Sequence, residues 1–162
     1  MKNFFKSINL IFSISTLILL TATPVLSSTR WVNVRNGNVP SNAISGGTDN
    51  NQTLYICTVG FATGKLLPSM GKCLIGWGGK EHGHSNYKVL VGNNYQWVRF
   101  RGQVPRNAVI GGSENGLRVY VCSGVYDGEW TPGKYVKSID SCLIGWGGKE
   151  RAVNNFHILV NK

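Results

Sequence analysis

The sequence has no long stretch with the three-to-four-residue hydrophobic period of an amphipathic helix. It also lacks the nucleophile-elbow pattern and the glycine-rich phosphate loop that mark many hydrolases and nucleotide-binding proteins. Its cysteines form pairs with fifteen and nineteen residues between them, spacings that do not resemble a zinc site. These absences argue against a helical fold, and we expect no catalytic residues, no metal and no cofactor.

Acidic residues are scarce in this chain of 162 residues. Seven Asp and Glu stand against seventeen Lys and Arg, which gives a net charge of +10 at pH 7. The basic residues are dispersed, with no run of five or more. Such a surface attracts acidic polysaccharide, anionic lipid or nucleic acid in a general way, or it serves solubility alone. Without a basic cluster we expect no nucleic-acid partner.

Residues 1–27 have the features of a secretory signal peptide. Lys2 and Lys6 precede an apolar run over residues 8–22, and small residues lead up to a cleavage site after Ser27. An uncleaved membrane anchor is the alternative, but it needs about twenty apolar residues. We therefore expect a secreted protein, extracellular or periplasmic in a bacterium, with no membrane insertion after cleavage. Removal of Lys2 and Lys6 leaves a net charge of +8.

The remaining chain is a tandem duplication. The nine residues 73–81, Cys-Leu-Ile-Gly-Trp-Gly-Gly-Lys-Glu, recur unchanged at 142–150. Shorter matches align the rest, with a first repeat over residues 28–92 and a second over 93–162. A β unit of about sixty-five residues is marginal alone. We therefore expect both repeats to pack as one pseudo-twofold-symmetric domain.

Short runs rich in β-branched and aromatic residues predict an all-β, antiparallel domain. The predicted strands are 31–35, 54–59, 73–77, 87–91, 95–101, 118–125, 142–146 and 155–160. Glycine is abundant, with 21 residues, and its Gly-Gly, Asn-Gly and Pro-Gly pairs are interpreted as turns between strands. Trp77 and Trp146 follow equivalent glycines, and we expect them to pack against the sheet in equivalent environments.

Each repeat has two cysteines, at matching positions. Export permits disulfides, and four cysteines allow three pairings. The duplication favours a symmetric pairing of Cys57 with Cys73 and of Cys122 with Cys142. Buried free thiols are the alternative, because a cysteine within a strand also packs as a small hydrophobic residue.

Both repeats share one order of short motifs: Trp-Val, Val-Pro-x-Asn-Ala, Gly-Gly, an acidic residue, Tyr-x-Cys, Gly-Lys, Cys and Gly-Gly-Lys-Glu. This combined pattern resembles the DM-nine (DM9) repeat and covers nearly all of the mature chain. That repeat occurs in tandem in mannose-binding lectins and beside pore-forming modules in natterin-like toxins. The resemblance implies a secreted, lectin-like protein whose partners are mannose-type glycans.

The resemblance also implies two ligand sites. In the lectins an acidic residue after Gly-Gly and the lysine of a Pro-Gly-Lys segment bind mannose, which by position implies Asp49 with Lys65 and Glu114 with Lys134. A carboxylate accepts hydrogen bonds and an ammonium donates them, which suits the vicinal hydroxyls of a sugar. A solvated surface salt bridge is the alternative for each pair.

Further residues around these pairs lead to additional expectations. Tyr126 and Trp130 lie in the longer loop of the second repeat, where we expect an aromatic face to cover the sugar. Glu81 and Glu150 follow glycine turns, and we expect their carboxylates to cap turn amides.

The alternative function is that of a non-enzymatic interaction protein whose basic surface binds an acidic polysaccharide or a membrane surface. The sequence leaves the oligomeric state open between a monomer and a homodimer.

Overall fold

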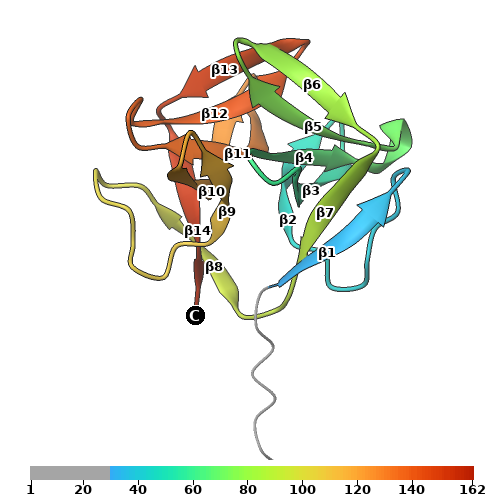
Figure 1. Cartoon of the computed structure of the whole chain (residues 1–162), viewed down its shortest axis with the longest axis horizontal. Coiled ribbons are helices and arrows are strands. Elements are labelled where there is room, and N and C mark those ends of the chain that lie inside the picture. The colour runs from blue at the N-terminus through green and yellow to red at the C-terminus, as the bar shows by residue number, and fades with distance from the viewer. Residues whose placement is uncertain (1–29) are drawn as a thin grey trace, which may run out of the picture.

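The computed structural model describes residues 30–162, and all but one short turn of its regular structure is β-strand (Figure 1). The all-β prediction is therefore confirmed. The predicted signal peptide, residues 1–27, lies outside the described residues. Within residues 30–162, no helix has both the length and the apolar character needed to cross a membrane.

Each repeat contributes seven strands in the same order. The first repeat contains β1 (Arg30–Arg35), β2 (Ser45–Asp49), β3 (Gln52–Thr58), β4 (Thr63–Leu67), β5 (Lys72–Trp77), β6 (Lys80–His84) and β7 (Asn86–Val91), with the 3-10 turn η1 (Pro68–Met70) after β4. The second contains β8 (Tyr95–Arg99), β9 (Ile110–Glu114), β10 (Leu117–Tyr126), β11 (Glu129–Val136), β12 (Ser141–Trp146), β13 (Lys149–Val153) and β14 (Phe156–Asn161). All eight predicted strands are present, and β2, β4, β6, β9, β11 and β13 were not predicted.

The strands form one antiparallel sheet with pseudo-twofold symmetry. Its order is β1-β7-β3-β4-β5-β6-β13-β12-β11-β10-β14-β8, in which equivalent strands follow one another from either end. The repeats meet where β6 lies beside β13, at the top of Figure 1. There Glu81 N–H donates to Gly148 O at 3.1 Å, and Glu150 N–H donates to Gly79 O at 3.2 Å. The reciprocal bonds place the pseudo-twofold axis between β6 and β13.

The hydrophobic core has one cluster within each repeat and a third that both repeats share. The shared cluster is built from equivalent positions of the two copies: Ile44 and Val109, Ile56 and Val121, Leu90 and Leu159. Burial of these side chains stabilises the association of the repeats as well as each repeat. The prediction that the repeats pack together as one domain is confirmed.

Two disulfides join strands that are not neighbours in the sheet. Cys57 of β3 bonds to Cys73 of β5, and Cys122 of β10 bonds to Cys142 of β12. The symmetric pairing is therefore confirmed, and the free-thiol alternative is wrong. Each bond crosses an intervening strand, so the sheet curls tightly within each repeat.

Removing one disulfide should destabilise the protein without changing its fold. Closing a loop of 16 residues, as Cys57–Cys73 does, restricts the unfolded chain and is expected to contribute about 3 kcal/mol. We expect the double variant Cys57→Ala/Cys73→Ala to lose roughly that free energy of unfolding, measured by urea denaturation. The equivalent variant of the second bond is the matched comparison, and unchanged stability in both would contradict the expectation.

The pairs Gly78-Gly79 and Gly147-Gly148 form turns, as predicted, but Gly46-Gly47 and Gly111-Gly112 do not. The latter two pairs lie within β2 and β9, where each strand packs against the other repeat. A Cβ on Gly47 would lie 1.6 Å from Trp130 O, and one on Gly112 would lie 2.4 Å from Gly60 O. Only glycine permits this approach of two backbones. These two pairs therefore belong to the interface between the repeats.

Candidate ligand site

Lys134 is a buried cation in the second repeat. It lies in β11 directly after Gly133, whose missing side chain allows the backbone to approach Leu143 O, 2.3 Å from where a Cβ would lie. The lysine is 1% exposed, and its Nζ lies 2.8 Å from Glu114 Oε2 and 3.5 Å from Glu150 Oε1. The structure thus brings Glu114 and Lys134 together and adds a second carboxylate. We call these three residues the Lys134 site.

A cavity of about 810 Å³ opens onto the Lys134 site, and all three charged residues line it. Its volume falls within the range of about 300–1,000 Å³ typical of small-molecule sites. Leu117, Tyr120 and Ile139 also line the cavity, and Leu117 and Ile139 are exposed hydrophobic residues. The cavity therefore combines buried charge with an apolar rim.

Lys65 occupies the equivalent position in β4 of the first repeat and is 3% exposed. Its Nζ lies 3.5 Å from Glu81 Oε1, but within residues 30–162 no ion pair of 4.0 Å or less joins it to Asp49. The salt bridge that was the alternative interpretation of this pair is therefore not formed. Instead the Asp49 carboxylate accepts a hydrogen bond from Asn50 Nδ2 at 3.0 Å. We call Asp49, Lys65 and Glu81 the Lys65 site.

Burial and nearby carboxylates have opposite effects on the pKa of Lys65. Burial lowers the pKa of its ammonium, and the nearby carboxylates of Glu81 and Asp49 oppose that shift without cancelling it. Asp49 therefore acts on Lys65 through the electrostatic field and not through a direct contact.

Trp146 of the second repeat covers Lys65 of the first, with Nζ 4.2 Å from the ring centroid. Because of this cation–π contact, both repeats contribute residues to the surroundings of Lys65. Trp77, the equivalent residue, is 46% exposed and packs against Phe61 and His82. Each tryptophan packs against an aromatic ring of its own repeat, but Trp77 is exposed whereas Trp146 covers a lysine, so the expectation of equivalent packed environments is wrong.

Glu81 and Glu150 cap turn amides, as expected, but each caps the turn of the other repeat. Glu81 Oε2 accepts from Gly148 N–H and Glu150 Oε2 accepts from Gly79 N–H, both at 2.9 Å. The second carboxylate oxygen of each residue faces the lysine of its own repeat. Sequence reasoning assigned neither residue to a ligand site, although their repetition in both copies was a signal.

The aromatic residues of the second loop lie away from the Lys134 cavity, contrary to the expectation. Tyr126 packs against Trp146 with ring centroids 6.0 Å apart, and Trp130 stacks on His157 at 4.5 Å. Neither residue lines the cavity, and the aromatic side chain that does is Tyr120. The longer loop extends β10 and β11 as a hairpin, so its rings are carried past the site.

The rims of the two sites differ. In the first repeat Ser69 Oγ donates to Gln52 Oε1 at 2.8 Å, which ties the start of β3 to η1. The equivalent positions in the second repeat are Leu117 and Ser138, which line the open cavity. A ligand entering the Lys65 site by the equivalent route would have to break this hydrogen bond.

Tyr135 lies beside the Lys134 site and gives a spectroscopic prediction. Burial, together with its hydrogen bond to Asp140, raises the pKa of its phenol to about 12. Because the folded pKa exceeds the unfolded value of 10.0, this contribution to stability is present below pH 10 and is lost as the pH rises through about 12. We expect Tyr135→Phe to remove the highest-pKa phase of tyrosinate absorbance in pH-jump measurements. Retention of that phase would contradict the assignment.

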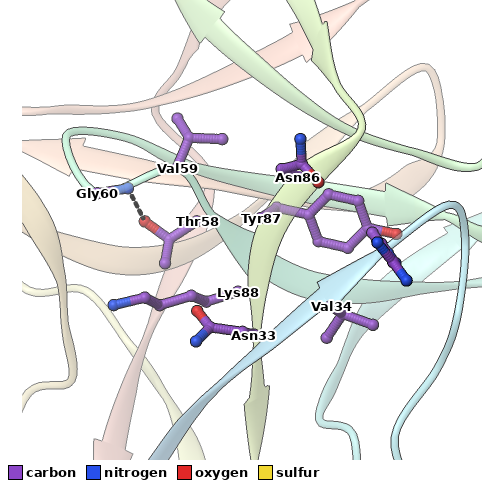
Figure 2. A pocket seen from close by; sticks show the side chains of 9 residues that line it. Asn33, Val34, Thr58, Val59, Gly60, Asn86, Tyr87 and Lys88 are labelled. Carbon is purple, nitrogen blue, oxygen red and sulfur yellow. Dashed lines mark hydrogen bonds between the residues drawn. The ribbon is translucent and has the colours of Figure 1, made fainter.

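A separate cavity of about 600 Å³ lies in the first repeat, between β1, β3 and β7. Figure 2 shows Lys88 and Asn33 in it, with the Lys88 ammonium pointing away from the Tyr87 ring. None of the residues predicted to bind ligand lines this cavity, and Lys88 is exposed. The Lys134 site, with its buried ammonium, is the stronger candidate.

Comparison with known proteins agrees with the resemblance to the DM9 repeat. A family model described as DM9 repeat matches residues 60–153, which span parts of both repeats. Natterin-4 of Thalassophryne nattereri is 38% identical over 78 residues, 47% of this chain and 19% of that protein. The chain therefore matches less than a fifth of the length of this relative.

A solved structure shares the fold. The nematode sperm cell motility protein MFP2B is similar with a TM-score of 0.62, over 85% of this chain and 48% of that chain. Sequence identity is 16%, so the likeness concerns the fold alone.

Proposed function

This chain belongs to the DM9 repeat family, and from that premise we propose that it is a carbohydrate-binding protein that recognises a mannose-type sugar at the Lys134 site. One observation carries the proposal. A buried ammonium is held between two carboxylates where a cavity of about 810 Å³ reaches them. The Lys65 site has the same lysine and a glutamate, but its acidic partner Asp49 stands apart.

The chemistry of the site suits a polyol. An ammonium has three donors, and each hydroxyl of a sugar can both donate and accept. Lys134 would donate to one hydroxyl while Glu114 accepts from its neighbour, so that adjacent hydroxyls are read together. Leu117 and Ile139 offer apolar surface to the C–H face of the ring. Binding alone performs this function, and the proposal includes no catalytic step, metal or cofactor.

The proposed setting is outside the cytoplasm. Disulfides form and persist in oxidising compartments, and both pairs of cysteines are bonded. They support export of the mature chain. The proposed partners are glycans, with neither nucleic acid nor membrane insertion involved.

Glu114→Gln tests the proposal in the disulfide-bonded protein. The substitution keeps the shape of the side chain but removes the charge that pairs with Lys134 at 2.8 Å. We expect methyl mannoside to bind the wild type saturably and the variant about tenfold more weakly, because charge-assisted hydrogen bonds are the stronger class. Isothermal titration calorimetry measures both affinities, and Lys88→Ala, an exposed lysine outside the cavity, is the control.

Two outcomes would count against the proposal. Absence of saturable binding by any neutral sugar on a glycan array, with binding only to acidic glycans, would favour the basic-surface alternative. Equal loss of affinity in Lys88→Ala and Glu114→Gln would detach binding from the Lys134 site. A neutral sugar bound through hydrogen bonds should also show little change in affinity between low and physiological salt.

A further inference from the structure

A second cavity adjoins the one at the Lys134 site. It has a volume of about 510 Å³ and is lined by residues that include Arg106, Arg118 and Lys137. Arg118, Tyr120 and Lys137 line both cavities, so these side chains form the wall between them. No Asp or Glu lines the second cavity, which we call the cationic cavity.

The three cations are specific to the second repeat. Alignment of the two repeat sequences pairs Arg106 with Ser41, Arg118 with Thr53 and Lys137 with Pro68. The scaffold is shared, as the equivalent register of Thr48 opposite Thr53 and Ser113 opposite Arg118 shows. The fold therefore does not require a cation at any of these positions.

The cations also lack internal partners. In the described part of the chain, none of Arg106, Arg118 and Lys137 forms an ion pair of 4.0 Å or less. The nearby carboxylates have other partners: Glu114 and Glu150 face Lys134, and Asp140 accepts a hydrogen bond from Tyr135 Oη at 2.8 Å. Three exposed positive charges around one cavity repel one another. A bound anion would relieve that repulsion.

We infer that the second repeat binds a sugar carrying an anionic substituent, a sulfate or a carboxylate, with the ring at the Lys134 site and the anion in the cationic cavity. The inference rests on the proposed function and names the ligand class of that same site. The shared wall of Arg118, Tyr120 and Lys137 places the two cavities side by side, as a ring and its substituent require. The two arginines offer paired N–H donors that match the geometry of a sulfate or a carboxylate. The Lys65 site, with Ser41, Thr53 and Pro68 at the equivalent positions, would take only the neutral sugar.

The test compares methyl mannoside with the same sugar carrying one sulfate, each titrated calorimetrically into the disulfide-bonded protein. We expect the sulfated sugar to bind about tenfold more tightly at low salt, since exposed ion pairs each contribute modestly. The variant Arg106→Ser/Arg118→Thr carries the first-repeat residues at two of the three positions and should lose most of the preference for the sulfated sugar. Arg35→Gln/Lys72→Ser removes two exposed positive charges from the first repeat and should keep the preference.

The outcomes separate this inference from the proposed function. Equal binding of both sugars by the wild type would overturn the inference and leave the lectin function standing, whereas binding of neither sugar would overturn both. A preference that both double variants lose equally would show general surface attraction and overturn the cationic cavity. Inorganic sulfate that competes as strongly as the sulfated sugar would show an anion site without sugar recognition, which also overturns the inference.

Discussion

Gly47→Ala is expected to lower the free energy of unfolding by about 3 kcal/mol or more, at the upper end of what overpacking costs. A Cβ there would lie 1.6 Å from the backbone oxygen of Trp130 and 2.4 Å from its carbonyl carbon. Backbone atoms cannot rotate away as a flexible side chain can, so β2 would have to separate from β11 of the other repeat. The loss should be measured by urea denaturation at constant pH.

Gly83→Ala is the matched control for this prediction. Gly83 also lies in a strand, β6, but an added Cβ would meet the flexible side chains of Lys72 at 3.0 Å and Leu74 at 3.2 Å. Small rotations of those side chains relieve the contact, and we expect little change in stability. If Gly47→Ala and Gly83→Ala had similar stability, the close packing of the repeats would not depend on glycine.

The strands recognisable from sequence are those with several β-branched or aromatic residues in a row. The strands β4 and β11 were not predicted because a glycine and a lysine interrupt their apolar runs, as in Gly64-Lys65 and Gly133-Lys134. The strands β2 and β9 were not predicted because their Gly-Gly pairs resemble turns. The reason for each glycine is a contact with another strand, often in the other repeat, and local sequence carries no information about that contact.

The candidate site, like the fold, could be predicted only in part from the sequence. The resemblance to the DM9 repeat supplied Glu114 and Lys134, and the structure places them in contact. It could not supply Trp146 above Lys65, because that contact joins the two repeats across the pseudo-twofold axis. The position-by-position comparison also paired Asp49 with Lys65, but the shorter aspartate forms no ion pair with that lysine within residues 30–162. Glutamate at 114 has one more methylene and reaches its lysine.

Lys134→Ala is expected to lose more sugar affinity than Lys65→Ala. Removing a charged partner from a buried hydrogen bond should cost about 1–3 kcal/mol, or roughly five- to a hundredfold in affinity. Lys134 lies on an open cavity, whereas Lys65 lies beneath the Trp146 ring, 4.2 Å from its centroid. The Trp146 ring therefore restricts the approach of a ligand to the Lys65 ammonium.

The rim of the Lys65 site leads to the same ranking. The hydrogen bond between Ser69 and Gln52 closes the position that Leu117 and Ser138 leave open in the second repeat. Calorimetric titration of methyl mannoside into Lys134→Ala and Lys65→Ala, with urea denaturation to show that both variants are folded, separates loss of the site from loss of the fold. Unchanged binding in both variants would remove the two lysines from sugar recognition. A larger loss in Lys65→Ala would make the composite site beneath Trp146 the principal one, and Gln52→Ala should then strengthen binding by opening its rim.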